Sequence, residues 1–361
     1  MSQEISRRGY LKTIGALIGG LAIGGAVGWL AKPEEAAKTV TQTITTGGQT
    51  LTQTLTQTLT AGGFPSTKKY KIILVGGDLG GEFWAPIHRG AEDASKWFNI
   101  DFPLTGPSGT DAVATHDAMK AAIAEKPDAI VAVLGDETMN QLTNEALSQG
   151  IPVVAMLIDD NPPHPSNRLA YIGTSQYESC FNTGKVLLNK YLSKKYPNGG
   201  KGVIFMHRPG APDLTARAQG FQDALTPAGF TFEVTTAGPE AETANEMAEA
   251  YLRSHPDVVV ALGCDGISTP AAGRAIDVLG LKDKVLGAGT DVIPRNVELM
   301  QKGCLWALMN QQQYIQPIVT ALSVWLHLYS DKELAPFSAS TGSGVVTPDN
   351  LALYTRTSRF H

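Results

Sequence analysis

Aromatic, carboxylate, guanidinium and amide side chains follow short apolar runs along this chain. They are Phe83 and Trp84 after residues 71–75, Asp159 and Asp160 after 152–157, Asp213 and Arg217 after 202–206, Asp265 after 258–262, Asp291 after 285–288, and Gln311 after 305–308. Aromatic faces cover the C–H patches of a sugar ring, while Asp, Arg and Gln form paired hydrogen bonds with its hydroxyls. If the fold brings these residues together, they suit a carbohydrate-binding site.

Each of these residues also has a structural interpretation. Phe83 and Trp84 suit the packing of a first helix on its sheet. An aspartate after a strand is as often a helix cap as a ligand contact, and Asp265, just ahead of a helix near Thr269, is the clearest such case. Arg217, in the first turn of a helix, could equally be a solvated surface side chain. The binding interpretation therefore depends on all of them lying at the same edge of their sheets.

Motifs for catalysis, metal binding and nucleotide binding are absent from the sequence. There is no GxxxxGK[ST] phosphate loop, no HExxH and no GxSxG, and the glycine-rich residues 76–81 do not fit GxGxxG. We therefore predict no catalytic residue, no metal and no cofactor. The members of a catalytic triad can lie far apart in a chain. An exported enzyme that uses Asp159, Asp265 or Asp291 as acid and base stays open as an alternative.

The composition is that of a soluble globular protein. Apolar residues make up 43% and charged residues 17% of the 361 residues. The formal charge of −5 argues against nucleic-acid binding, which needs a basic face. The three cysteines, Cys180, Cys264 and Cys304, contain no CxxC pair. They are either small buried residues or provide one disulfide.

Short apolar runs alternate with amphipathic stretches from residue 68 onward. We expect strands at 71–75, 128–134, 152–157, 202–206, 230–235, 258–262, 285–288 and 305–308, and helices at 85–97, 111–125, 137–149, 177–196, 214–228, 240–254, 269–279 and 317–328. This alternation predicts an α/β protein with parallel sheets covered on both faces. The repeats form two groups of similar length, so a ligand crevice is expected at the carboxyl ends of the strands.

The amino-terminal residues carry an export pattern. Arg7 and Arg8 are preceded by Ser6 and followed by an aromatic, a leucine and a lysine, and residues 14–31 contain no charged side chain. This resembles a twin-arginine signal. Two outcomes stay open for residues 1–31: removal as a signal, or retention as a membrane anchor. Residues 32–67 are threonine-rich, with repeated Thr-Leu-Thr-Gln, and are expected to form an extended tether.

The order of several motifs resembles the ribose- and galactose-type periplasmic binding proteins that feed ABC importers. The motifs are Phe83-Trp84-Ala85-Pro86-Ile87-His88-Arg89-Gly90-Ala91, Gly150-Ile151-Pro152-Val153-Val154, Asn167-Arg168-Leu169-Ala170-Tyr171-Ile172-Gly173-Thr174, Pro212-Asp213-Leu214-Thr215-Ala216-Arg217, His255-Pro256-Asp257 and Gly289-Thr290-Asp291. The resemblance implies two similar doubly wound parallel-sheet lobes joined by a multi-strand hinge. The lobes would be 68–175 plus 312–342, and 176–311 plus 343–361.

The family's binding residues can be carried over by position. The stacking aromatics would be Phe83 and Trp84, the ligand arginine Arg217 with Asp213 a turn earlier, and the remaining polar contacts Asp265, Asp291 and Gln311. Two departures stand out. Many relatives have an aspartate where this chain has Leu157, and its acidic pair, Asp159-Asp160, comes two residues later. Gly81-Glu82 replaces a frequent Asn-Pro, so the ligand stays open.

The resemblance implies an extracytoplasmic receptor that binds a sugar or polyol between its lobes and delivers it to a permease and its ATPase. The amino-terminal segment would be its contact with the membrane. A ligand-sensing ectodomain for a membrane signalling partner is the alternative. The repressors that share this core carry a helix-turn-helix in the place where this chain has its export pattern.

Overall fold

The computed structural model describes residues 37–46, 49–58, 68–160, 165–342 and 344–355. The chain divides into two units, residues 1–63 and 64–361. The predicted signal or anchor at 1–31 lies outside the described residues. Within the described part of the chain, no helix has both the length and the hydropathy that a membrane crossing requires.

The threonine-rich segment forms a two-stranded hairpin. Strand β1 (Ala37–Thr46) pairs antiparallel with β2 (Gln49–Thr58), with Ala37 opposite Thr58 and Thr46 opposite Gln49. Within residues 32–67, which are expected to form an extended tether, the structure pairs residues 37–46 with residues 49–58. Threonine is β-branched and alternates with other residues here, and Gly47-Gly48 is a dipeptide favoured in tight hairpins.

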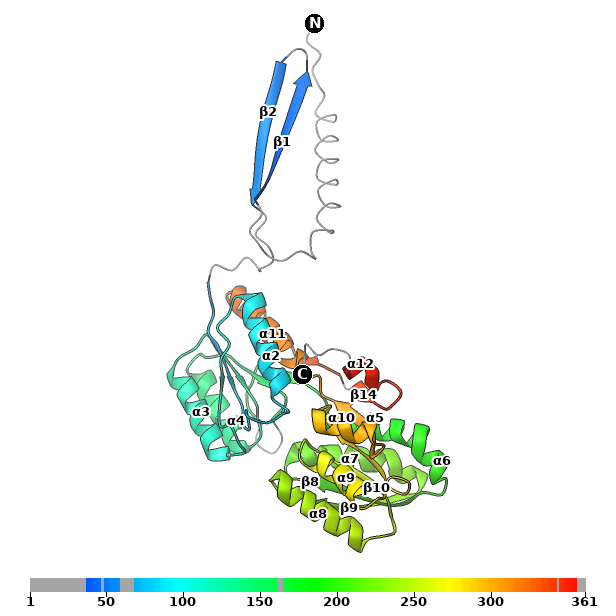
Figure 1. Cartoon of the computed structure of the whole chain (residues 1–361). Helices are drawn as coiled ribbons and strands as arrows, with labels where there is room; N and C mark the ends of the chain where they lie inside the picture. Colours follow the sequence, from blue (N-terminus) through cyan, green and yellow to red (C-terminus); the bar gives the residue numbers. More distant parts are fainter. Residues whose placement is uncertain (1–36, 47–48, 59–67, 161–164, 343, 356–361) are drawn as a thin grey trace. The chain divides into compact units, whose positions relative to one another are not determined.

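Two six-stranded sheets organise residues 68–355 (Figure 1). The first has the order β13-β7-β6-β5-β3-β4, all parallel, and its strands are β3 (Ile72–Val75), β4 (Leu104–Thr105), β5 (Ala129–Ala132), β6 (Val153–Met156), β7 (Ala170–Gly173) and β13 (Ala339–Ser340). The second has the order β14-β12-β11-β10-β8-β9, with β8 (Gly200–Met206), β9 (Phe230–Thr236), β10 (Val258–Gly263), β11 (Leu286–Thr290), β12 (Leu305–Asn310) and β14 (Gly344–Val346). Only β14 is antiparallel to its neighbour in these described sheets.

Helices cover both sheets. The first sheet carries α2 (Ala85–Phe98), α3 (Ala112–Ala124), α4 (Glu137–Ser148) and α11 (Ile315–Tyr329), and we call this body the N-terminal lobe. The second carries α5 (Gln176–Leu187), α7 (Pro212–Leu225), α8 (Ala241–Ser254), α9 (Ser268–Val278), α10 (Pro294–Gln301) and α12 (Leu351–Thr355), and we call it the C-terminal lobe. Helix α5 continues through a π-helical turn (Leu188–Leu192) into α6 (Ser193–Lys195), and a 3-10 turn (Thr226–Ala228) follows α7.

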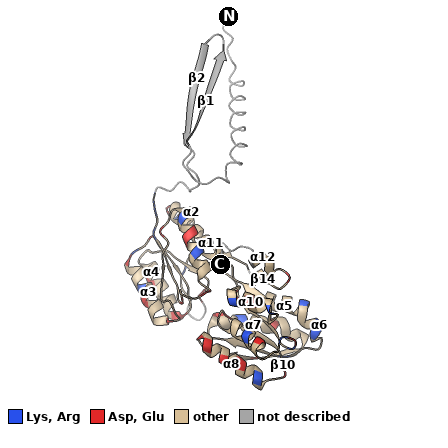
Figure 2. Ribbon diagram, viewed as in Figure 1, with Lys and Arg blue, Asp and Glu red and all other residues tan. Residues whose placement is uncertain are grey.

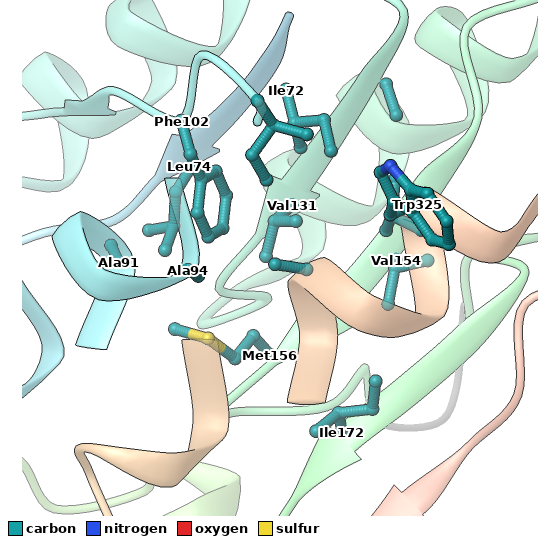
Figure 3. Close-up of a cluster of buried hydrophobic side chains, with 14 of the residues drawn as sticks. Ile72, Leu74, Ala91, Ala94, Phe102, Val131, Val154, Met156, Ile172 and Trp325 are labelled. Carbon is teal, nitrogen blue, oxygen red and sulfur yellow. The ribbon is translucent and has the colours of Figure 1, made fainter. Parts of the chain in front are cut away.

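Each sheet has an apolar cluster on both faces, which explains why its strands are apolar throughout. In the N-terminal lobe, Trp325 of α11 is fully buried in the same cluster as Ile72 and Leu74 (Figure 3). Helix α11 follows β12 of the other sheet, so the chain returns to the first lobe after building the second. On the outside of the C-terminal lobe, charges of both signs occur, with acidic residues along α8 and lysines at α6 (Figure 2).

Three chain segments connect the lobes and meet at Thr174. They run between β7 and α5, between β12 and α11, and between β13 and β14. The Thr174 hydroxyl lies 3.3 Å from the Gln311 carbonyl, 3.1 Å from the Gly342 carbonyl and 3.2 Å from the Thr341 hydroxyl. The predicted fold class, two doubly wound parallel lobes with a multi-strand hinge, is confirmed.

Replacing Trp325 tests the packing of α11 on the N-terminal lobe. Trp325→Ala removes a fully buried ring and should lower the free energy of unfolding by about 3–5 kcal/mol. The measurement is urea unfolding followed by circular dichroism. The matched control is Trp97→Ala, because Trp97 on α2 is 50% exposed and its loss should cost about 0.5 kcal/mol or less. Equal midpoints for the two variants would contradict this packing.

Candidate functional site

A cavity of about 320 Å³ is lined by residues of both lobes. Its walls come from the loops after the strands, which is where a ligand site is expected in parallel α/β sheets. Seven of the eight site residues predicted from the sequence line it: Phe83, Trp84, Asp213, Arg217, Asp265, Asp291 and Gln311. The structure therefore brings together residues that are more than 200 positions apart.

Phe83 and Trp84 form the aromatic wall, in the turn that leads into α2. Their rings meet edge to face, with centroids 6.2 Å apart and planes at 80°. Trp84 is only 4% exposed, and its ring lies so close to Gly76 that a Cβ there would come within 2.4 Å of it. The lack of a side chain at Gly76, directly after β3, thus makes room for the Trp84 ring. The pair presents apolar surface to the cavity.

Arg217 is the buried cation of the site, in the second turn of α7 and 4% exposed. Its Nε donates to Gln176 Oε1 at 2.7 Å, and its Nη1 donates to the Cys264 carbonyl at 2.7 Å. Burial acts to lower the pKa of Arg217, but the negative charges of Asp291 and Asp213 outweigh this effect and raise the pKa above its ordinary value. The guanidinium is therefore charged and held in a fixed direction.

Asp291 and Gln311 form the acceptor side. Gln311 Nε2 donates to Asp291 Oδ1 at 2.6 Å, and Gln311 Oε1 is buried without a hydrogen-bond partner among the described residues. Burial raises the pKa of Asp291, while Arg217 and Gln311 act against that rise. Asp291 has a φ of +74°, and Asn296 Nδ2 holds this turn by donating to its carbonyl at 2.8 Å. The Gln311 oxygen therefore keeps the capacity to accept a hydrogen bond.

Asp213 lies in the first turn of α7, 7% exposed. Its Oδ1 is 4.0 Å from Arg208 Nη2, a distance too long for a hydrogen bond. Together with Arg217 and Asp291, it gives the C-terminal lobe a cluster of donors and acceptors that can bind several hydroxyls at once.

Asp265 lines the cavity, but its carboxylate already accepts four hydrogen bonds. Oδ1 accepts from the backbone N–H groups of Ile267 (2.9 Å) and Ser268 (2.7 Å). Oδ2 accepts from the backbone N–H of His207 (3.0 Å) and from the Ser268 hydroxyl (2.8 Å). It therefore holds the start of α9, the capping interpretation that the sequence left open. It also fixes His207, which lines the cavity.

Asp159 does not line the cavity, so the structure separates it from the other predicted residues. Its carboxylate pairs with Arg168, whose Nη2 lies 2.6 Å from Oδ2. Asp160, beside it, accepts from the Ser166 hydroxyl at 2.7 Å. The cavity wall at the end of β6 is Leu157 instead, with a φ of +70°. Both carboxylates thus lie within 4 Å of Arg168 Nε instead of lining the cavity.

Several cavity residues were missed from the sequence. His207 and Arg208 directly follow β8, so the same strand-end rule would have found them. Asp78, in the loop after β3, is another. Burial raises its pKa above the ordinary value, although His207 acts against that rise. Glu82 and Arg295 also line the cavity, and Arg295 Nε donates to Glu82 Oε1 at 3.2 Å from the opposite lobe. These two are 213 positions apart, and no local signal pairs them.

In the described ranges, no three or more His, Cys, Asp and Glu residues gather in a way that could hold a metal ion. The three cysteines are buried free thiols, which decides between the two interpretations left open by the sequence.

Residues 72–330 match the model of a protein family described as the periplasmic binding protein domain. The chain belongs to this family. A relative in the family is the xylose/arabinose-binding protein XylF of Sulfolobus acidocaldarius, which is 28% identical over 316 residues, covering 83% of this chain and 76% of that protein.

Solved structures share the family's fold with this chain. GanP, a glucose-galactose binding protein from Geobacillus stearothermophilus, superposes with a TM-score of 0.70 at 24% identity, over 79% of this chain and 99% of that one. An ABC transporter solute-binding protein from Burkholderia graminis, solved in complex with D-arabinose, gives 0.71 at 20% identity, over 81% and 100%. At these identities the likeness shows the two-lobed fold.

The capping of α9 by Asp265 predicts a pH-dependent stability. Burial acts to raise the pKa of Asp265, but hydrogen bonds from His207 and Ser268 lower it below its ordinary value. The ionised carboxylate therefore stabilises the fold above its ordinary pKa of about 3.9, and this stabilisation is lost as the pH falls through the lower folded value. Asp265→Asn should lower the free energy of unfolding at pH 7 by about 1–3 kcal/mol.

The measurement is urea unfolding of both proteins between pH 7 and pH 3. The difference between their free energies of unfolding should be largest at neutral pH and should become smaller in acid. Asp117→Asn, at an exposed position on α3, is the control and should differ from the parent by about 0.5 kcal/mol or less. A difference in the free energy of unfolding that grows in acid is incompatible with a stabilising ionised Asp265.

Proposed function

We propose that this protein is an extracytoplasmic receptor that binds a monosaccharide in the interlobe cavity and delivers it to an ABC importer. The observation that carries this proposal is the buried group of Arg217, Asp291 and Gln311 facing the same cavity as Trp84. The XylF relative is named for xylose and arabinose, and the Burkholderia protein was solved with D-arabinose. Both names support a sugar as the ligand of this chain.

The proposed binding mode divides the ligand between the lobes. Trp84 and Phe83 of the N-terminal lobe cover a face of the ring, while Arg217, Asp213, Asp291 and Gln311 of the C-terminal lobe bind its hydroxyls. A buried carboxylate and guanidinium are tolerated when they are paired, and sugar hydroxyls can donate to the first and accept from the second. In this binding mode, Asp265 holds His207 in place, and Asp159 does not contact the ligand.

The mechanism follows from contacts to both lobes. A ligand that binds the closed arrangement better than the open one shifts the equilibrium towards closure, and the hinge segments around Thr174 absorb the rotation. A permease with its ATPase would recognise the closed form. No bond of the sugar is made or broken, so the protein acts as a receptor and not as an enzyme.

The export of the chain is part of the proposal. The twin-arginine pattern at Arg7 and Arg8 would direct the folded protein across the membrane, and residues 14–31 would remain as an anchor. In a host with this export pathway, the full-length protein should sediment with membranes. The R7K/R8K double variant should stay in the cytoplasm. Recovery of a shortened protein in the soluble extracytoplasmic fraction would contradict retention of the anchor.

A thermal-shift screen of D-xylose, L-arabinose, D-arabinose, D-glucose and D-galactose tests the function. A sugar at about 100 times its Kd should stabilise the folded state by about 2.7 kcal/mol and raise the melting temperature. Trp84→Ala and Arg217→Ala should abolish this rise while circular dichroism shows a folded protein. Trp97→Ala and Arg274→Ala remove the same side chains from exposed positions and should keep it. Conversion of any of these sugars into product, or full affinity in both cavity variants, would overturn the proposal.

A further inference from the structure

Gln176 joins the buried arginine of the site to the opposite lobe. It is the first residue of α5, directly after the hinge segment, and its side chain is half-buried. Its Oε1 accepts from Arg217 Nε at 2.7 Å, and its Nε2 donates to the Leu157 carbonyl at 3.1 Å. One amide therefore contacts the cation of the C-terminal lobe and the end of β6 in the N-terminal lobe.

The direction of this amide is determined by its two partners. Arginine has only donors, so the group facing Arg217 must be the amide oxygen. A carbonyl has only acceptors, so the group facing Leu157 must be the amide nitrogen. A glutamate at this position would keep the first bond and lose the second, and a methionine would lose both. The two bonds can thus be removed separately.

Leu157 is a firm anchor for this connection. Its N–H donates to the Ile172 carbonyl at 3.2 Å, and its carbonyl also accepts from the Tyr171 hydroxyl at 3.0 Å. It has a positive φ and lines the cavity. In this chain the backbone carbonyl, and not a carboxylate, is the polar group used at this position.

Arg217 depends on few partners for its orientation. Two of its five N–H groups are used by Gln176 and the Cys264 carbonyl. The Cys264 bond connects it only to its own lobe. Gln176 is the partner that relates the guanidinium to the N-terminal lobe, where Trp84 contacts the same cavity.

We propose that Gln176 is a positioning residue that aligns Arg217 with the N-terminal wall of the cavity and thereby sets the affinity for the sugar. This inference rests on the proposed function, because it concerns a side chain that acts through the ligand arginine. Ligand affinity should then be sensitive to each end of the amide, and not only to the end that contacts Arg217.

The experiment compares Q176M, Q176E and the matched control Tyr171→Phe. This control removes the other donor to the Leu157 carbonyl, and its 3.1 Å contact with the Thr174 carbonyl, without touching Arg217. The probe is the sugar of the five-sugar panel that binds the parent most tightly. Calorimetry gives Kd and stopped-flow tryptophan fluorescence gives the dissociation rate. Q176M and Q176E should each weaken binding about 10-fold or more, mostly through faster dissociation. Tyr171→Phe should change Kd by about 2-fold or less.

Wild-type affinity in either Gln176 variant would overturn the inference. An equal loss in Tyr171→Phe would overturn it too, because the loss of affinity would then not depend on the contact with Arg217. A second measurement needs no ligand: the melting temperatures of Q176M, R217M and the double variant. If Gln176 acts by holding Arg217, the double variant should lose less than the sum of the single losses; additive losses contradict this. If the parent protein binds none of the sugars, the proposed function is wrong. The melting temperatures of the single and double variants still test whether Gln176 and Arg217 are coupled.

Discussion

The burial of Arg217 is the constraint on which the rest of this site depends. A guanidinium that is 4% exposed is tolerated only when charges and hydrogen-bond acceptors replace the water it has lost. Asp291 and Asp213 supply the charge, and Gln176 and the Cys264 carbonyl supply acceptors. These groups come from four different elements, so the site exists only when the C-terminal lobe is fully folded and the hinge is in place.

The parallel α/β architecture makes this concentration of charge feasible. Successive strands end at the same edge, so residues far apart in the chain meet there without any long loop. The apolar clusters on both faces of each sheet keep the strands rigid behind the cavity. Polar groups that the protein does not satisfy, such as Gln311 Oε1, remain at the cavity edge, where a ligand with several hydroxyls can satisfy them.

The fold was largely predictable from the sequence, because buried parallel strands are short apolar runs and amphipathic helices alternate with them. Strands β4, β7, β13 and β14 were missed, because each has only two to four residues, too few for a periodic pattern to be recognised. The rule that site residues follow strands correctly placed seven of the eight predicted residues at the cavity. It did not separate residues that face the cavity from those with a structural role. Asp265 holds the start of α9, and Asp159 pairs with Arg168. The Glu82–Arg295 pair and the contacts of Gln176 depend on the meeting of two lobes, for which one sequence contains no local signal.

The crystal structure of this protein with the tightest-binding sugar of the panel tests the central claim most directly. The account predicts the sugar ring against Trp84, with hydroxyl oxygens at hydrogen-bond distances of about 2.7–3.2 Å from Arg217, Asp291 and Gln311. It also predicts that Asp159 stays with Arg168, away from the sugar. A sugar bound elsewhere, or one in this cavity that leaves the Arg217 guanidinium without a contact, would contradict it.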